Sequence, residues 1–180
     1  GVLSIDGDST VKFNSGNALT NNSSINLLDV KSWVYFQQDN PDELLTSISR
    51  LWVNDEVGVV DQNLRINQFY QHGAIVRKRD LAYLPLSIYS GSSLSGASAS
   101  LGEATIYAGS SIPAGMNNQS RSFVLKRGYM ATFAIQENGT GKSKVYIASE
   151  EDLRIDDLPA ALQGNVSFIR VLPWNWASKK

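Results

Sequence analysis

Cysteine is missing from this 180-residue sequence, while proline, methionine and histidine are scarce, with five, two and one copies. The lack of cysteine excludes disulfides, thiolate metal centres and a cysteine nucleophile. A large net charge of either sign is absent as well, because the 16 Lys and Arg residues nearly balance the 17 Asp and Glu residues. Nucleic acid and anionic membrane surfaces attract a basic field, so neither is expected as a partner.

Long hydrophobic runs are also absent. No stretch approaches the roughly 20 apolar residues that span a bilayer, and no segment has the pattern of a signal peptide. The short apolar runs are separated by Gly, Ser and Asn, and charged residues make up only 18% of the chain. This pattern favours a mainly β protein, whose length accommodates one domain or two small ones.

Catalytic motifs are missing too: the sequence has no nucleophile elbow, P-loop or zinc-ligand spacing. The single histidine, His72, is expected in a solvated turn beside Gly73. The acidic residues at 55–56, 150–152 and 156–157 lie in turn-like contexts and are interpreted as solvated acids, although a sequence does not reveal carboxylates that pair in space. We therefore predict that the chain is not itself an enzyme.

Several strands are predicted in the first 83 residues. Residues 2–13 indicate two short strands around a turn at Gly7 and Asp8. A strand is expected at 32–36, and residues 64–78 are typical of a hairpin that turns near His72. The sequence predicts antiparallel neighbours here and no parallel sheet.

One helix is predicted, over residues 41–53. Asn40 is a suitable N-cap, Pro41 suits the first helical position, and two acidic residues follow where the helix dipole favours negative charge. Apolar residues then recur at helical spacing. This apolar face consists of Leu44, Leu45, Ile48, Leu51 and Trp52. The helix is expected to pack on a sheet, which makes residues 1–83 a small α+β subdomain.

The second half of the chain repeats itself with a period of about 45 residues. The matching positions are Tyr89, Gly96 and Ser122 in the first copy and Phe133, Gly141 and Ser167 in the second. Self-similarity at a fixed period indicates a duplicated supersecondary unit. Four short strands in each copy predict two Greek keys packed as a β-sandwich over residues 84–175.

The repeated pattern is an aromatic residue and a glycine, followed at a distance by Asn-Asn-x-x-x-Ser before an apolar strand. It resembles the βγ-crystallin motif, in which the aromatic and the glycine shape the first hairpin and the serine stabilises its folded-over turn. The resemblance covers about half the chain. It implies a mainly β protein with a βγ-crystallin-like two-Greek-key sandwich beside the smaller N-terminal α+β subdomain.

Many microbial members of that family bind calcium through an Asn/Asp-Asn/Asp-x-x-Ser/Thr-Ser signature, so the resemblance implies Asn117 and Asn118 as candidate ligands. However, Arg121 stands where a hydroxyl ligand is expected, and a guanidinium is unfavourable beside a hard divalent cation. Asp6 and Asp8 have the alternating spacing of a calcium loop, although a hairpin turn is favoured. We expect no required cofactor, with a structural calcium ion as the alternative.

The last residues, VSFIRVLPWNWASKK, carry a second resemblance. Together with VLKRGYMATFA they are similar to the stretch that precedes the catalytic domain in secreted polysaccharide hydrolases of marine-type bacteria, agarase-like or β-1,3-glucanase-like. The resemblance implies a secreted accessory region whose partner is a C-terminal catalytic domain of the same polypeptide. Residues 176–180 would then begin the linker to that domain.

Aromatic residues are the most suggestive feature for function, because flat rings stack on sugar rings while nearby polar groups bond their hydroxyls. We predict a non-catalytic carbohydrate-binding module with an algal galactan of the agar type, or a β-1,3-glucan, as its polysaccharide partner. The candidate binding residues are Trp33, Tyr35, Asn67, Gln68, Tyr70, Arg77, Trp174 and Trp176. Two alternatives stay open: a domain that braces an adjacent hydrolase domain, and a calcium-stabilised module.

Overall fold

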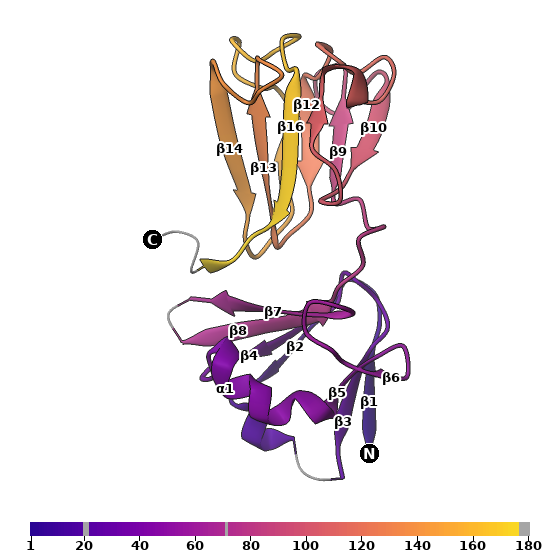
Figure 1. The fold of residues 1–180 in the computed structure, drawn as a ribbon, viewed down its shortest axis with the longest axis vertical. Coiled ribbons are helices and arrows are strands. Elements are labelled where there is room, and N and C mark those ends of the chain that lie inside the picture. The colour runs from indigo at the N-terminus through magenta and orange to yellow at the C-terminus, as the bar shows by residue number, and fades with distance from the viewer. Residues whose placement is uncertain (20–21, 71, 177–180) are drawn as a thin grey trace. The chain divides into compact units, whose positions relative to one another are not determined.

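The computed structural model describes residues 1–19, 22–70 and 72–176. These residues form two compact units, one comprising Gly1–Asp80 with Asn175 and Trp176, the other Leu81–Trp174 (Figure 1). Each unit has its own hydrophobic core. Residues 177–180 of the predicted linker and the side chain of Ile48 lie outside the described part. Among the described residues, no helix has the length and apolar character to cross a membrane.

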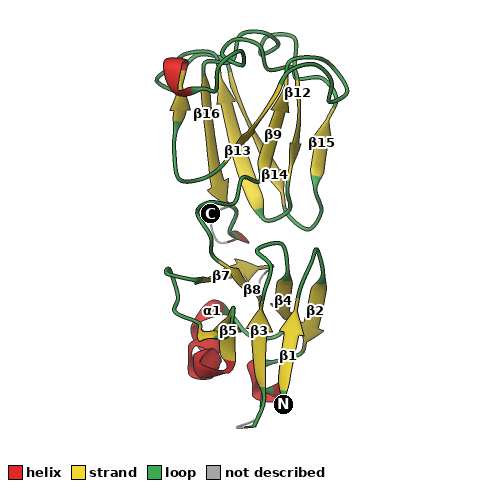
Figure 2. Ribbon diagram, turned by 90° about the vertical axis from the view of Figure 1, so that its right-hand side faces the viewer, coloured by secondary structure: helices red, strands yellow, loops and turns green. Residues whose placement is uncertain are grey.

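The first unit consists of two four-stranded sheets. The first sheet has the order β1-β3-β5-β6, with β1 Val2–Ile5, β3 Ser24–Leu27, β5 Leu51–Val53 and β6 Glu56–Val57. The second sheet has the order β2-β4-β8-β7, with β2 Thr10–Phe13, β4 Trp33–Phe36, β8 Gly73–Lys78 and β7 Leu64–Phe69. The strands β1, β3 and β5 pair in parallel, as do β2 and β4, and the others pair antiparallel (Figure 2).

This parallel pairing contradicts the predicted hairpin over residues 2–13 and the expected lack of parallel strands. The chain does turn at Gly7, whose φ is 70°, but β1 and β2 enter different sheets instead of pairing. This turn is hydrogen-bonded to the segment where β4 begins: Ser32 Oγ donates to the Gly7 carbonyl at 2.6 Å, and the Trp33 N–H donates to the Ser9 carbonyl at 2.9 Å. Tertiary contacts between successive turns therefore replace the local hairpin.

The predicted helix begins where the sequence places it but ends early. Asn40 Oδ1 accepts from the Glu43 N–H at 3.0 Å, and Glu43 Oε2 accepts from the Asn40 N–H at 2.8 Å, so both halves of a capping box are formed. Helix α1 covers only Pro41–Leu44, and a 3-10 helix follows over Leu45–Arg50. Leu51 and Trp52 belong to β5, because pairing with β3 overrides their helical spacing.

The other strand predictions for the first unit are confirmed. Strand β4 falls within the predicted 32–36 segment, and β7 and β8 form the predicted hairpin, with Phe69 opposite Gly73. Besides the 3-10 helix at Leu45–Arg50, the described chain has short 3-10 helices at Gly16–Ala18 in this unit and at Gly109–Ser111 in the second. The core lies between the two sheets and includes Leu27, Val34, Phe36, Leu51 and Val76.

The second unit is the predicted sandwich of two Greek keys. One key supplies β9 Leu86–Tyr89, β10 Ser98–Leu101, β11 Tyr107–Ala108 and β12 Ser122–Leu125. The other supplies β13 Tyr129–Ala134, β14 Ser143–Ala148, β15 Leu153–Ile155 and β16 Phe168–Pro173. The sheet orders are β10-β9-β12-β15 and β11-β16-β13-β14, so each key gives its third strand to the other key's sheet.

Three aromatic rings join the two sheets of this sandwich. The ring of Phe123 on β12 lies 4.9 Å from that of Phe133 on β13 and 4.8 Å from that of Tyr146 on β14, measured between centroids. Both phenylalanines are fully buried. Burial also raises the pKa of the Tyr146 hydroxyl above its ordinary value, because desolvation disfavours the phenolate.

Candidate functional site

The first folded hairpin of the sandwich is held by Ser122, as the motif implies. Ser122 Oγ donates to the Gly91 carbonyl at 2.6 Å and accepts from the Leu94 N–H at 2.9 Å. Leu94 has a φ of 61°, a region that a branched side chain rarely occupies, so this bond fixes an unfavourable turn. Gly96 closes the hairpin with a φ of 81°. The serine thus stabilises a turn that the local sequence alone would not hold.

The second hairpin is held by a different contact. Its strand register also shifts the alignment of the two sequence repeats by one residue. Ser122 pairs with Tyr89, whereas Phe168 pairs with Ala134, so the structural counterparts of Tyr89 and Ser122 are Ala134 and Phe168. A Cβ built on Gly139 would lie 3.3 Å from the Phe168 ring, which therefore packs over this hairpin in place of a serine hydroxyl. The aligned Phe133 points into the core instead.

The two hairpins allow a matched test. Ser122→Ala is expected to lower the free energy of unfolding of the sandwich by about 1–2 kcal/mol, because it leaves a part-buried N–H and carbonyl without their partner. Ser167→Ala is the control, since that hydroxyl donates to the exposed Asn118 side chain at 2.7 Å, and its loss should cost under about 1 kcal/mol. Urea unfolding of both variants measures the difference, and equal losses would contradict the role given to Ser122.

The residues of the calcium signature do not form a fitting donor set. Asn117 and Asn118 are exposed, and Asn118 Oδ1 accepts the Ser167 hydroxyl hydrogen bond. Arg121 occupies the hydroxyl position and forms an ion pair with Asp157, with 2.8 Å between Nε and Oδ1. Calcium prefers six to eight oxygen ligands, usually including carboxylates. Among residues 1–19, 22–70 and 72–176, no three His, Cys, Asp or Glu side chains gather as a metal site.

The other calcium candidates, Asp6 and Asp8, are exposed in the turn between β1 and β2. Asp6 Oδ1 accepts from the Gly7 N–H at 2.8 Å, and the Asp6 carbonyl accepts from Ser9 Oγ at 3.0 Å. These local bonds describe a turn, although β1 and β2 enter different sheets and do not form the predicted hairpin. A structural calcium ion stays a prediction from the sequence, and these residues alone supply too few ligands for it.

Four of the predicted sugar-binding rings come together around a fifth that the sequence analysis did not single out. Phe69 contacts Trp33, Tyr35 and Tyr70, with centroids 5.9, 5.2 and 4.5 Å apart, and Tyr70 contacts Trp176 at 4.9 Å. Only Tyr70, at 40% exposure, is largely accessible, whereas Trp33 is buried. Most ring faces in this aromatic cluster are thus occupied by other rings.

The remaining predicted residues are less accessible than the hypothesis requires. Arg77 is 2% exposed and Trp174 4%, so neither offers a free surface to a sugar. The strand β16 ends at Pro173, and Trp174 and Trp176 therefore do not share a strand face. Asn67 and Gln68 are half-buried on β7, where Gln68 Nε2 donates to the Tyr70 carbonyl at 3.2 Å.

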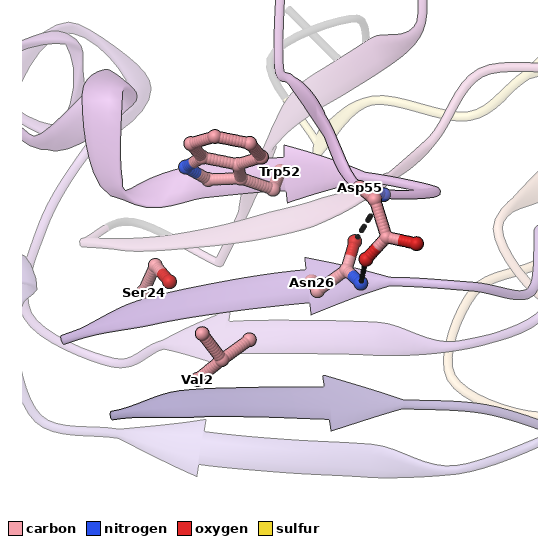
Figure 3. A pocket seen from close by; sticks show the side chains of 5 residues that line it. All are labelled: Val2, Ser24, Asn26, Trp52 and Asp55. Carbon is pink, nitrogen blue, oxygen red and sulfur yellow. Dashed lines mark hydrogen bonds between the residues drawn. The ribbon is translucent and has the colours of Figure 1, made fainter.

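A hollow lies on the outer face of the first sheet, across the three parallel strands. Trp52 on β5 forms one wall and Val2 on β1 the other, with Ser24 and Asn26 on β3 between them (Figure 3). The hollow has a volume of about 340 Å³, which includes space open to solvent. It adjoins a second open hollow of about 560 Å³, which is lined by Trp52 and by Arg50. The half-buried indole of Trp52 is therefore exposed to ligands on this face.

Asp55 completes the hollow from the turn after β5. Its N–H donates to Asn26 Oδ1 at 3.0 Å, and its Oδ1 accepts from Asn26 Nδ2 at 2.8 Å, so the two side chains hold each other (Figure 3). Asp55 has a φ of 66° and the preceding Asn54 a φ of 49°, a tight turn that suits these residue types. The sequence analysis missed this site because it assigned Trp52 to a helix; the Asn54-Asp55 turn signal was the available clue.

Comparison with solved structures finds a βγ-crystallin-like fold over about half of the chain. No protein-family model matches the chain, and no curated protein does. Among solved structures, the N-terminal domain of protein S is similar at 22% identity, with a TM-score of 0.44, over 50% of this chain and 97% of that one. A βγ-crystallin domain from Flavobacterium johnsoniae is similar at 24% identity, with a TM-score of 0.43, over 49% and 94%. One from Clostridium beijerinckii is similar at 18%, with a TM-score of 0.41, over 48% and 95%.

Proposed function

We propose that this chain is a non-catalytic polysaccharide-binding region and that the polysaccharide lies in the hollow beside Trp52. The observation that carries the proposal is a half-buried indole that walls a mainly apolar hollow, with polar side chains beside it, on the outer face of the first sheet. The ring can stack on the apolar face of a sugar, while Ser24 and Asp55 offer polar atoms to its hydroxyls and the buried Asn26 holds Asp55 in place. Parallel pairing sets Val2 opposite Ser24 and Asn26 opposite Trp52 on one surface.

The charge in the hollow favours a neutral sugar. Asp55 Oδ2 takes part in no hydrogen bond within the described chain, so it remains an acceptor for a sugar hydroxyl. A carboxylate beside the ligand repels sulfate groups. Agar-type galactans and β-1,3-glucans, the ligands implied by the resemblance to hydrolases, carry many hydroxyls and little charge. They fit the part of the surface beside Asp55 better than sulfated galactans do.

The site is open, and its affinity is expected to be modest. A shallow surface buries little of a hydrated sugar, which gives dissociation constants of roughly micromolar to millimolar. The adjoining hollow extends the surface past Trp52 toward Ser49 and Arg50, so a chain of sugars has room to continue. The expected ligand is therefore an oligomer or polymer and not a single sugar.

Affinity electrophoresis against agarose and laminarin tests the proposal. Trp52→Ala is expected to weaken retardation by about 10- to 100-fold in affinity, equivalent to roughly 1–3 kcal/mol. Trp52→Phe keeps a flat ring and should retain most of the binding. Tyr70→Ala is the matched control, because it removes an exposed ring from the aromatic cluster instead. The melting temperature of each variant should change little.

Other outcomes would replace the proposal. Loss of binding in Tyr70→Ala but not in Trp52→Ala would move the site to the aromatic cluster, and a fall in stability equal to the fall in affinity would mean that Trp52 acts by packing. If no polysaccharide retards the chain, a bracing role beside a hydrolase domain takes its place. The hydrolase context, the lack of enzyme activity and the extracellular location stay predictions from the sequence.

A further inference from the structure

Strand β14 lies at the edge of its sheet, where β13 is its neighbour on one side only (Figure 1). Directly before the strand, the Ile135 N–H donates to the Lys142 carbonyl at 3.1 Å. Bonded and non-bonded pairs alternate along an antiparallel ladder, so every second residue of β14 turns its N–H and C=O away from β13. These residues are Ser143, Val145 and Ile147. Within residues 1–19, 22–70 and 72–176, no hydrogen bond reaches the outward backbone groups.

The same edge exposes apolar side chains. Val145 is 49% and Ile147 38% exposed, whereas Tyr146 between them faces the core. Ile147 lies opposite Met130 on β13, and Met130 lies opposite Leu172 on β16, so an apolar row crosses the sheet from this edge. An edge strand with open backbone groups and β-branched side chains is a template on which another strand can pair.

The one charged residue within the strand, Lys144, leaves this edge open. Its backbone groups belong to the set that faces β13. Its Nζ lies 5.0 Å from the centre of the Tyr146 ring, a cation–π contact within its own strand. The ammonium is therefore held beside the core-side ring, away from the outer face that carries Val145 and Ile147.

The charges at the two ends of β14 have opposite signs. Lys142 and Lys144 are exposed at its start, and Glu150 and Glu151 are exposed just after its end. Within the described ranges, these four side chains form no ion pair. An antiparallel copy of the strand sets its acidic end beside the basic start of the first, and does so twice, whereas a parallel copy sets like charges together. The strand is thus complementary to itself across a twofold axis.

We propose that a second copy of this chain binds this edge, with β14 pairing antiparallel to β14 of the copy. Val145 lies at the twofold axis opposite Val145 of the copy, and Ser143 lies opposite Ile147 on either side of it. This register uses all the outward backbone groups of β14 and joins the two sheets edge to edge. The interface is a single strand pair, so the dimer is transient, with a dissociation constant of roughly 100 μM. The inference is independent of sugar binding at Trp52.

Hydrogen exchange of the full chain, resolved by residue with NMR, tests the pairing. The amides of Ser143, Val145 and Ile147 are expected to exchange about fivefold more slowly at roughly 1 mM protein than at roughly 10 μM, because pairing protects edge amides. The amides of Lys144 and Tyr146 already bond to β13 and should change little with concentration.

Two lysine variants locate the interface by sedimentation equilibrium. Val145→Lys sets two like charges opposite each other at the axis and should raise the dissociation constant of the dimer about 10-fold or more. Ser100→Lys is the matched control, because it adds the same charge at an exposed position on β10, an edge strand of the other sheet. It should leave the dissociation constant unchanged, and both variants should keep the melting temperature of the unmodified chain.

A charge swap tests the direction of pairing. Lys142→Glu sets acidic groups beside Glu150 of the copy and should weaken the dimer by about fivefold. Adding Glu150→Lys to that variant restores opposite charges and should restore the affinity. A parallel pair would set like charges together in each of these chains, so it predicts no restoration.

Three outcomes would overturn the inference. A chain that stays monomeric up to roughly 1 mM would show that the edge of β14 accepts no second copy. A dimer whose dissociation constant is the same in Val145→Lys would show that another surface joins the copies. A charge swap that does not restore the affinity lost in Lys142→Glu would exclude the antiparallel arrangement.

Discussion

Phe123→Ala is expected to lower the free energy of unfolding of the second unit by about 3–5 kcal/mol, because truncating a fully buried ring removes its burial and leaves a cavity. The ring lies on β12 and contacts Phe133 and Tyr146 on the opposite sheet, so its loss weakens the contact between the two Greek keys. Hydrogen exchange resolved along the chain under mild denaturant measures the loss, which should be confined to residues 81–174.

The matched control for this variant is Val145→Ala. Val145 lies on β14 in the same sandwich but is 49% exposed, and its truncation should cost less than about 1 kcal/mol. Retardation of Phe123→Ala by agarose or laminarin should equal that of the unmodified chain, because the Trp52 hollow belongs to the first unit. Loss of retardation in this variant would contradict that placement and move binding to the sandwich.

Phe36→Ala is expected to have an effect of similar size on the first unit, about 3–5 kcal/mol. Phe36 is fully buried between the two sheets and stacks on Phe13, with centroids 5.6 Å apart. Domains have roughly 5–15 kcal/mol of stability, so the loss removes a large part of it and raises the fraction of molecules that lack the parallel sheets. Retardation by polysaccharide should fall with the folded fraction, because that sheet carries Trp52 and Asn26.

Lys12→Ala provides the control, since Lys12 is exposed on the neighbouring strand β2 and its loss leaves the core unchanged. Protection of the second unit should persist in Phe36→Ala. Equal loss of protection in both units would contradict two separate cores. Retained polysaccharide binding in a variant whose first unit is unfolded would contradict the site at Trp52.

The features that the sequence predicted well are those that short segments determine by themselves. The strand at β4 and the hairpin of β7 and β8 follow from alternating apolar residues bounded by turn residues. The capping box at Asn40 and Glu43 depends on residues three positions apart. The two Greek keys were predictable because a duplicated unit repeats the same residue pattern in the sequence, even though the copies differ in how each hairpin is held.

The candidate site was not predictable in the same way. Trp52 has apolar neighbours at helical spacing, yet it lies on a strand because Leu51 and Val53 complete the core beside β3. Asn26 and Asp55 meet across 29 positions of sequence, which no local pattern indicates. The predicted aromatic residues do gather, but mainly on one another around Phe69.

By itself, the sequence determined where the chain turns, which short segments extend, and that the second half is a duplicated sandwich. The tertiary structure alone decided which strands are neighbours in the first half. A strand of four residues carries no information on the direction of its partner, because its backbone can bond on either side to a parallel or an antiparallel neighbour. That choice came from stacking Leu3 on Ile25 and Val11 on Val34, and it placed Trp52 on an open sheet face.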